Sequence, residues 1–167
     1  MNLKVSGKYE GDAMKISDLI ALEGIIANLK ATSKKQALQE LSRRAGDIIG
    51  VQERSIFDVI MERERLGTTG VGNFIAIPHG KLPQLHGLCG LFARLGRPID
   101  FQSIDEQPVD LIFMLLAPAQ AGADHLKALA LIARLLRNPK ICTKLRGTES
   151  AEALFAILTE TQESPVL

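Results

Sequence analysis

The chain has 167 residues, of which 46% are hydrophobic and 23% charged, and its formal net charge is +1. This composition is ordinary for a globular protein, and the length suits one domain with a sizeable core. So small a net charge, without a cluster of lysine or arginine, excludes the basic footprint of a nucleic-acid-binding domain, and we expect no nucleic-acid partner.

The sequence also argues against a membrane or secreted protein. Its longest apolar stretch, LIFMLLAPA, is too short to span a bilayer, and the N-terminus lacks the apolar core of a signal peptide. The cysteines, Cys89 and Cys142, do not have the spacing of zinc or redox motifs, so we expect two reduced core thiols. These features predict a cytoplasmic protein without membrane insertion.

The first half of the chain carries two helical patterns. Residues 1–13 are polar and are predicted to form a flexible extension before a single domain over residues 14–160, with residues 161–167 as a tail. Ser33 and Gln36 form an S-x-x-Q capping box ahead of a helix over residues 34–49. A second helix is expected over residues 52–66, ending at Gly67.

The second half alternates between strand and helix patterns. Short apolar runs predict strands over residues 74–77, 87–95 and 109–117. A long helix is expected over residues 124–136, followed by shorter helices over 140–146 and 150–158. Strands separated by helices predict an α/β fold with helices on both faces of one sheet. The residues of the long helix expected to face the core are Leu126, Leu129, Ile132, Ala133 and Leu136.

The segment LGTTGVGN contains Gly67, Gly70 and Gly72 in close succession. It lacks the Gly-Lys-Ser/Thr ending of a Walker loop and the third glycine of a dinucleotide fingerprint. Glycines let backbone N–H groups approach an anion closely, but the same residues suit a helix cap followed by a tight turn. From this segment alone, a helix cap followed by a tight turn is the favoured interpretation.

The motif Pro78-His79-Gly80 follows the apolar run FIAI. Proline keeps the preceding residue extended, and glycine leaves an open approach to the ring, so His79 is expected at a strand end on rigid backbone. Such a mount suits a nucleophile, since a neutral imidazole has an available lone pair at cytoplasmic pH. The alternative is a solvated histidine in a turn.

Two further residues favour phosphoryl chemistry at His79. Arg63 lies sixteen positions earlier, where a short glycine loop could fold it back, and His125 opens the long helix. His125 could instead be a solvated residue of the first helical turn, and His86 is expected to be exposed. No three-ligand metal pattern is present, whereas a histidine acceptor with an arginine fork suits a transferring phosphoryl group. We therefore expect no metal site.

The segments RERLGTTGVGNFIAIPHGKL, PVDLIFMLLAP and DHLKALALIARLL occur in this order. In sequence and spacing they resemble the enzyme IIA components of the mannitol/fructose type of the bacterial phosphoenolpyruvate-dependent phosphotransferase system (PTS). From about Ile16 to Thr159 the chain most resembles the nitrogen-regulatory branch of that family. The resemblance identifies residues 14–160 as a type 2 EIIA domain and implies a mixed sheet of about five strands.

The resemblance also implies a function and its residues. His79 would accept a phosphoryl group from a small HPr-like phosphocarrier protein of the nitrogen branch, with Arg63 and His125 as the supporting residues. Regulatory target proteins, including potassium-transport or sensor proteins, would respond to the phosphorylation state, and no cofactor is needed. We expect the phosphate-binding groups to come from Thr68, Thr69, Asn73 and Gly80.

Alternatives to this regulatory carrier remain. The chain could be a sugar-specific IIA protein that passes phosphate to a IIB domain, or a binding module whose His79 is never phosphorylated. A small hydrolase built on two histidines is a further alternative, although no G-x-S-x-G motif supports it. One departure concerns the loop: where this chain has Phe74, the family usually has glycine.

Overall fold

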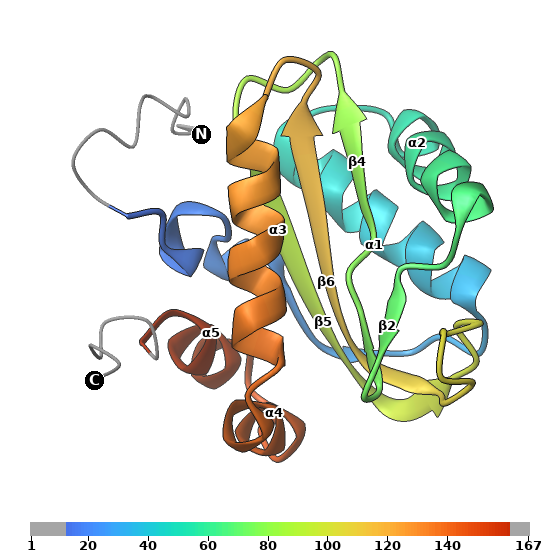
Figure 1. Ribbon diagram of the computed structural model, residues 1–167, viewed down its shortest axis with the longest axis vertical. Coiled ribbons are helices and arrows are strands. Elements are labelled where there is room, and N and C mark those ends of the chain that lie inside the picture. The colour runs from blue at the N-terminus through green and yellow to red at the C-terminus, as the bar shows by residue number, and fades with distance from the viewer. Residues whose placement is uncertain (1–12, 161–167) are drawn as a thin grey trace.

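One mixed sheet organises the chain in the computed structural model, which describes residues 13–160 (Figure 1). The predicted extension and the predicted tail lie outside the described residues, apart from Ala13. The strands are β1 (Ile25–Leu29), β2 (Gly70–Gly72), β3 (Ile75–Ala76), β4 (His79–Leu82), β5 (Cys89–Ile99) and β6 (Val109–Pro118). The helices are α1 (Lys34–Ile49), α2 (Glu53–Leu66), α3 (Ala123–Leu136), α4 (Pro139–Arg146) and α5 (Ala151–Glu160), with 3-10 turns η1 (Ile16–Asp18) and η2 (Leu22–Gly24).

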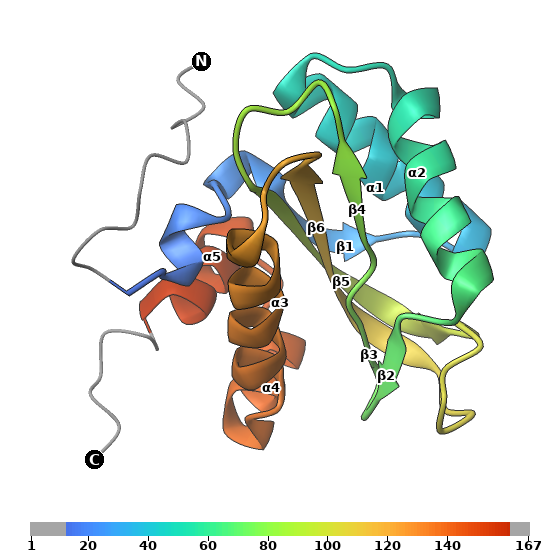
Figure 2. The ribbon, with the colours of Figure 1, turned by 45° about the horizontal axis from the view of Figure 1, so that its top comes forward.

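Strand β6 is the centre of the sheet. The order is β1-β5-β6-β3-β2, and β4 also pairs with β6, beyond the end of β3 (Figure 2). The β5–β6 pairing is antiparallel, whereas β3 and β4 run parallel to β6. Every residue from Leu111 to Ala117 is fully buried, because helices cover both faces at this strand.

Two hydrophobic cores lie on the two faces of the sheet. Helices α1 and α2 cover one face, and α3, α4 and α5 cover the other (Figures 1 and 2). Neighbouring β6 residues alternate between them: Phe113 packs in the core under α3, and Met114 in the core under α1. The α/β fold with a mixed, doubly covered sheet is therefore confirmed, with six strands where about five were expected.

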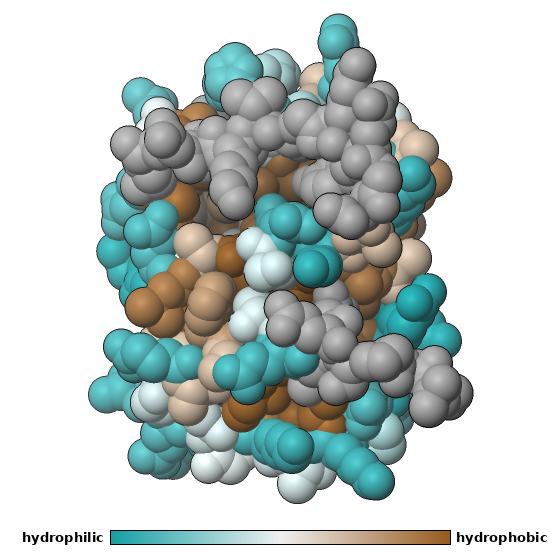
Figure 3. Space-filling view, turned by 90° about the vertical axis from the view of Figure 1, so that its left-hand side faces the viewer, coloured by the Kyte–Doolittle hydropathy of each residue, from teal (hydrophilic) through white to brown (hydrophobic). Residues whose placement is uncertain are grey.

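The side of the molecule that carries η1 and α5 is shown as a surface in Figure 3. Hydrophobic surface is visible there between hydrophilic residues, in keeping with apolar side chains such as Phe155 that are only partly buried. No helix within residues 13–160 is long and apolar enough to cross a membrane.

The ends of the first two helices follow local sequence signals. Ser33 Oγ accepts a hydrogen bond from the Gln36 backbone N–H at 3.1 Å, as the capping box predicts. The Gln36 side chain, however, accepts from the backbone N–H of Thr32 at 2.7 Å, where a standard capping box would use Ser33. Helix α2 ends at Leu66 with Gly67 as its cap, as predicted.

Three strands were not predicted, namely β1, β2 and β4. Strands β2 and β4 are short and contain glycine, so they lack the alternating pattern that marks a half-buried strand. The inward position of Leu126 is also wrong, because its side chain is 68% exposed. The buried stripe of α3 runs through Ala128, Ile132 and Leu135, and Leu126 lies nearly opposite Ala128 around the helix.

Cys89 and Cys142 are both buried and unbridged, which confirms the prediction of two reduced core thiols. Burial raises the pKa of the Cys89 thiol to about 12, so this thiol is protonated at neutral pH. Neither a thiolate nucleophile nor a thiolate ligand is available at Cys89.

The N-cap of α1 provides a test of the fold. Ser33→Ala should lower the free energy of unfolding by about 1 kcal/mol, because the Gln36 N–H loses its side-chain acceptor. Ser33→Asp keeps an acceptor oxygen and should remain within a few tenths of wild type, as measured by urea denaturation. Equal stability of the Ala and Asp variants would contradict a capping role.

Candidate functional site

Three elements bring the predicted site residues together. Arg63 lies in the last turn of α2, His79 is the first residue of β4, and His125 lies in the first turn of α3. Strand β4 runs between α2 and α3 in Figure 1. His79 was expected at the end of a strand; it instead begins one, because the chain after Pro78 pairs in parallel with β6, with His79 opposite Leu115.

The backbone orients the imidazole of His79. Its Nδ1 lies 2.9 Å from the carbonyl oxygen of Ile77, two residues earlier in the chain. A carbonyl oxygen can only accept, so Nδ1 carries the proton and Nε2 keeps the lone pair. The available lone pair of His79 is therefore on Nε2.

Arg63 donates to that nitrogen. Its Nε lies 3.3 Å from His79 Nε2, and its Nη1 donates to the carbonyl oxygen of Gly67 at 2.9 Å. The guanidinium thus connects the imidazole to the loop that follows α2, as the sixteen-residue spacing suggested. A planar, permanently charged fork in this place suits the oxygens of a phosphoryl group.

His125 is the second histidine of the site. Its ring centroid lies 5.7 Å from that of His79, and the rings are tilted by 53°. Its Nε2 is buried and has no hydrogen-bond partner among the described residues. Buried polar atoms are normally paired, so an unpaired ring nitrogen beside a nucleophile is a candidate contact for a ligand. His86, by contrast, is exposed as predicted.

The environment keeps both rings neutral. Burial lowers the pKa of His79, and the nearby Arg63 cation lowers it further, although the hydrogen bond to Ile77 and the Glu64 carboxylate act in the opposite direction. Burial also lowers the pKa of His125, with added repulsion from His79 and Lys81. At neutral pH the lone pair of His79 Nε2 is available.

The predicted phosphate-binding groups of the loop already have hydrogen-bond partners in the structure. The Thr69 N–H and hydroxyl both bond to the buried Glu64 carboxylate, and the Asn73 N–H donates to Asp105 at 3.1 Å. The Thr68 hydroxyl donates to the Phe101 carbonyl oxygen and accepts from Gly70 N–H. These groups hold the loop together, and binding phosphate through them would require their present hydrogen bonds to break.

Gly80 serves packing in this structure. A Cβ at this position would lie 2.6 Å from Cγ1 of Val59 on α2. The missing side chain therefore lets α2 approach β4, and this close approach places Arg63 beside His79.

Phe74 occupies a turn that favours glycine. Asn73 and Phe74 connect β2 to β3 with φ of 56° and 67°, the left-handed values of a two-residue hairpin turn. Arg146 of α4, which sequence reasoning missed, holds this turn. Its guanidinium lies 5.7 Å from the centre of the Phe74 ring, and its Nη2 donates to the Asn73 carbonyl oxygen at 3.3 Å. The departure from the family is thus accommodated by contacts from another element.

A metal site is not apparent within residues 13–160, where no three His, Cys, Asp or Glu side chains gather closely enough. The chemistry of the site instead rests on a neutral imidazole, a guanidinium and a second imidazole. A neutral imidazole beside a guanidinium suits the acceptance of a phosphoryl group.

Comparison with known families decides the affiliation. The family described as "Phosphoenolpyruvate-dependent sugar phosphotransferase system, EIIA 2" matches residues 18–161. The chain belongs to this family. The membership inferred from the motifs around His79 is confirmed, and the chain is an EIIA-type component of the phosphotransferase system.

Relatives of this EIIA chain include nitrogen regulatory proteins. It is 60% identical over 145 residues to a nitrogen regulatory protein of Bradyrhizobium diazoefficiens, across 87% of this chain and 95% of the relative. It is 36% identical over 153 residues to a fructose-specific EIIA component of Haloferax volcanii, across 91% and 99% of the two chains. The crystal structure of nitrogen regulatory protein IIA-Ntr from Neisseria meningitidis matches with a TM-score of 0.82 and 33% identity, across 86% and 99%.

The electrostatics of the EIIA site can be tested by titration. Arg63→Met removes the cation beside His79, so the pKa of His79 should rise toward its ordinary value of about 6.5 while burial still holds it below. NMR titration of the ring measures this shift. Arg65→Met removes a charge from the same helical turn and should leave the His79 pKa unchanged. A fall in the pKa in Arg63→Met would contradict the assigned contact.

Proposed function

We propose that this EIIA chain carries a phosphoryl group on Nε2 of His79 and receives it from an HPr-like carrier of the nitrogen branch. The arrangement around the ring supports this proposal. Nδ1 is held by the Ile77 carbonyl oxygen, Nε2 meets Arg63, and the unpaired Nε2 of His125 lies on the neighbouring ring. Family membership supports the same chemistry.

The transfer needs neither cofactor nor metal. The lone pair of His79 Nε2 attacks the phosphorus of the donor phosphohistidine in line, and the donor P–N bond breaks as the new bond forms. The donor imidazole leaves with the electron pair of the broken bond. Positive charge develops on the His79 ring, where the Nδ1–H bond to Ile77 stabilises it.

The phosphoryl oxygens need positive or N–H partners as they arrive. Arg63 now donates to the attacking nitrogen itself, so its fork must turn from Nε2 to the equatorial oxygens during transfer. His125 can donate a hydrogen bond to an oxygen through Nε2 once its proton sits on that nitrogen. Thr68, Thr69, Asn73 and Gly80 are secondary candidates that require the loop to rearrange.

Phosphorylation would act as a signal through charge. A phosphoryl group adds roughly −1.5 to −2 charge at neutral pH, on a chain whose formal net charge is +1. Proteins that dock around His79 would therefore meet a negatively charged group in the phosphorylated protein and a neutral ring beside the Arg63 cation in the unphosphorylated protein. The 60% identical nitrogen regulatory protein supports regulatory targets over a sugar permease. The family resemblance suggests potassium-transport or sensor proteins as such targets.

A sugar-specific role remains the second candidate, because a fructose-specific EIIA component is 36% identical to this chain. The two roles differ in the acceptor of the phosphoryl group. Phosphorylated protein incubated with a fructose IIB domain would transfer its phosphate under the second role and retain it under the first. Return of phosphate to the HPr-like carrier is expected in both.

The acceptor residue can be identified by mass spectrometry. After incubation with enzyme I, the HPr-like carrier and phosphoenolpyruvate, the protein should gain one phosphate that is acid-labile and base-stable. His79→Ala should abolish the gain. His86→Ala, which removes an exposed histidine outside the site, should be phosphorylated like wild type. A wild-type protein that gains no phosphate would favour a binding module, and normal labelling of His79→Ala would refute the assigned acceptor.

The role of His125 is separable from that of His79. His125→Gln keeps a hydrogen-bond donor and should transfer at a rate between those of wild type and His125→Ala. One neutral hydrogen bond contributes about 0.5–1.5 kcal/mol, so we expect a rate loss of roughly two- to tenfold in the Ala variant. Rapid-quench kinetics measure these rates. A wild-type rate in His125→Ala would make this residue an ordinary part of the helix start.

A further inference from the structure

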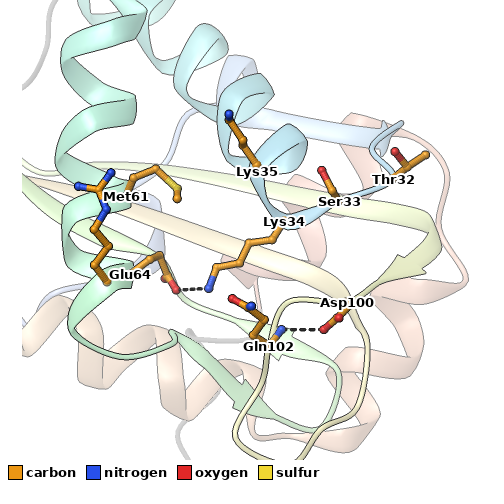
Figure 4. Close-up of a pocket in the computed structure, with 9 residues that line it drawn as sticks. Thr32, Ser33, Lys34, Lys35, Met61, Glu64, Asp100 and Gln102 are labelled. Carbon is orange, nitrogen blue, oxygen red and sulfur yellow. Dashed lines mark hydrogen bonds and ion pairs between the residues drawn. The ribbon is translucent and has the colours of Figure 1, made fainter.

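A cavity of about 550 Å³ lies between the start of α1, the last turns of α2 and the segment after β5 (Figure 4). Within it, Lys34 of α1 points toward Glu64 of α2 (Figure 4). The two charged groups lie 2.7 Å apart, and their side chains are 13% and 2% exposed. The Glu64 carboxylate is therefore held almost entirely inside the protein, paired with the Lys34 ammonium group.

Glu64 has a second set of partners beyond the cavity. The Thr69 backbone N–H donates to its two carboxylate oxygens at 3.1 and 3.3 Å, and the Thr69 hydroxyl also donates to Oε1. One carboxylate thus joins α1 to the loop that leads from α2 to the His79 strand. A carboxylate suits this junction, because it offers about four acceptor positions and needs no donor of its own.

Two hydrogen bonds connect Thr69 of this loop to the ring of His79. The Thr69 carbonyl oxygen accepts from Ile77 N–H at 2.9 Å, and the Ile77 carbonyl oxygen accepts from His79 Nδ1 at 2.9 Å. Arg63, the neighbour of Glu64 in the chain, contacts Nε2 of the same ring. Both ring nitrogens of His79 are therefore connected to the helical turn that contains Glu64, Nδ1 through Ile77 and Thr69 and Nε2 through Arg63.

We propose that Glu64 is a positioning residue for phosphoryl transfer: through Thr69 and Ile77 it fixes the tautomer and orientation of His79. The kinetic part of this inference rests on the proposed function, whereas the tautomer of His79 can be observed without any transfer. Stability alone is a poor reason for the cluster, since buried ion pairs can often be replaced by apolar side chains at little or no cost.

Paired double variants separate positioning from charge. Lys34→Met/Glu64→Leu removes both charges and every side-chain acceptor for Thr69. Lys34→Met/Glu64→Gln removes the same charges but keeps a carbonyl oxygen for the Thr69 N–H. Glu62→Gln changes one charge at an exposed position of α2 and serves as the control. Nitrogen-15 NMR reports the tautomer of His79, rapid-quench kinetics the transfer rate, and thermal unfolding the stability.

In the Leu double variant the Nδ1–H tautomer should no longer predominate, and transfer should slow by about ten- to a hundredfold, as for a misplaced reacting group. The Gln double variant should keep the tautomer and remain within about threefold of wild type, the scale of one weakened hydrogen bond. Thr69→Val keeps the ion pair but loses the hydroxyl bond, so it should shift the tautomer away from Nδ1–H, as in the Leu double variant. This single variant tests the same connection if the Leu double variant folds poorly.

A wild-type tautomer and rate in the Leu double variant, whatever its melting temperature, would overturn the positioning role. Equal impairment of the two double variants would also overturn it, because the effect would then belong to the lost charges. If the wild-type protein accepts no phosphate, the proposed function fails, and the tautomer comparison alone still decides whether Glu64 orients His79.

Discussion

The carbonyl oxygen of Ile77 decides which nitrogen of His79 keeps its lone pair. It takes the Nδ1 proton, so the lone pair must lie on Nε2, the atom that Arg63 approaches. This carbonyl is itself held, because the Ile77 N–H donates to Thr69 and the next carbonyl, that of Pro78, accepts from Leu115 of β6. The tautomer of a single imidazole therefore depends on the loop after α2 and on the central strand of the sheet.

The same arginine suits both states of the proposed reaction. Before transfer, Arg63 and burial lower the pKa of His79 and keep the ring neutral. After transfer, the guanidinium would face an anion where a neutral ring had been. A fixed cation thus disfavours protonation of the nucleophile and favours the charged product, so no new charged group has to be brought in during the step.

Local signals in the sequence were sufficient for much of the fold. Helix α1 has the predicted bounds, and β6 was predicted because a strand buried on both faces is a continuous apolar run. Strand β4 was not predicted, since its four residues become a strand only by pairing with β6, 36 positions later in the chain. The local pattern of apolar and polar residues does not indicate a pairing partner so far away in the chain.

Part of the candidate site was likewise predicted from the sequence, and part was not. His79, Arg63 and His125 were predicted from residue type and spacing, and the structure places them together. Glu64 was not, because nothing in the charged run MERERL indicates that this one carboxylate is buried while its neighbour Glu62 is exposed. Its burial depends on Lys34 of another helix, which only the tertiary arrangement supplies.

The parallel pairing of β4 with β6 also determines when the site can form during synthesis of the chain. His79 stands opposite Leu115, and its neighbouring ring, His125, comes later still. A growing chain that has emerged only as far as β5 holds Arg63 and His79 but has no strand on which to align β4. An incomplete chain therefore cannot bring His79 and His125 together until the start of α3 has left the exit tunnel.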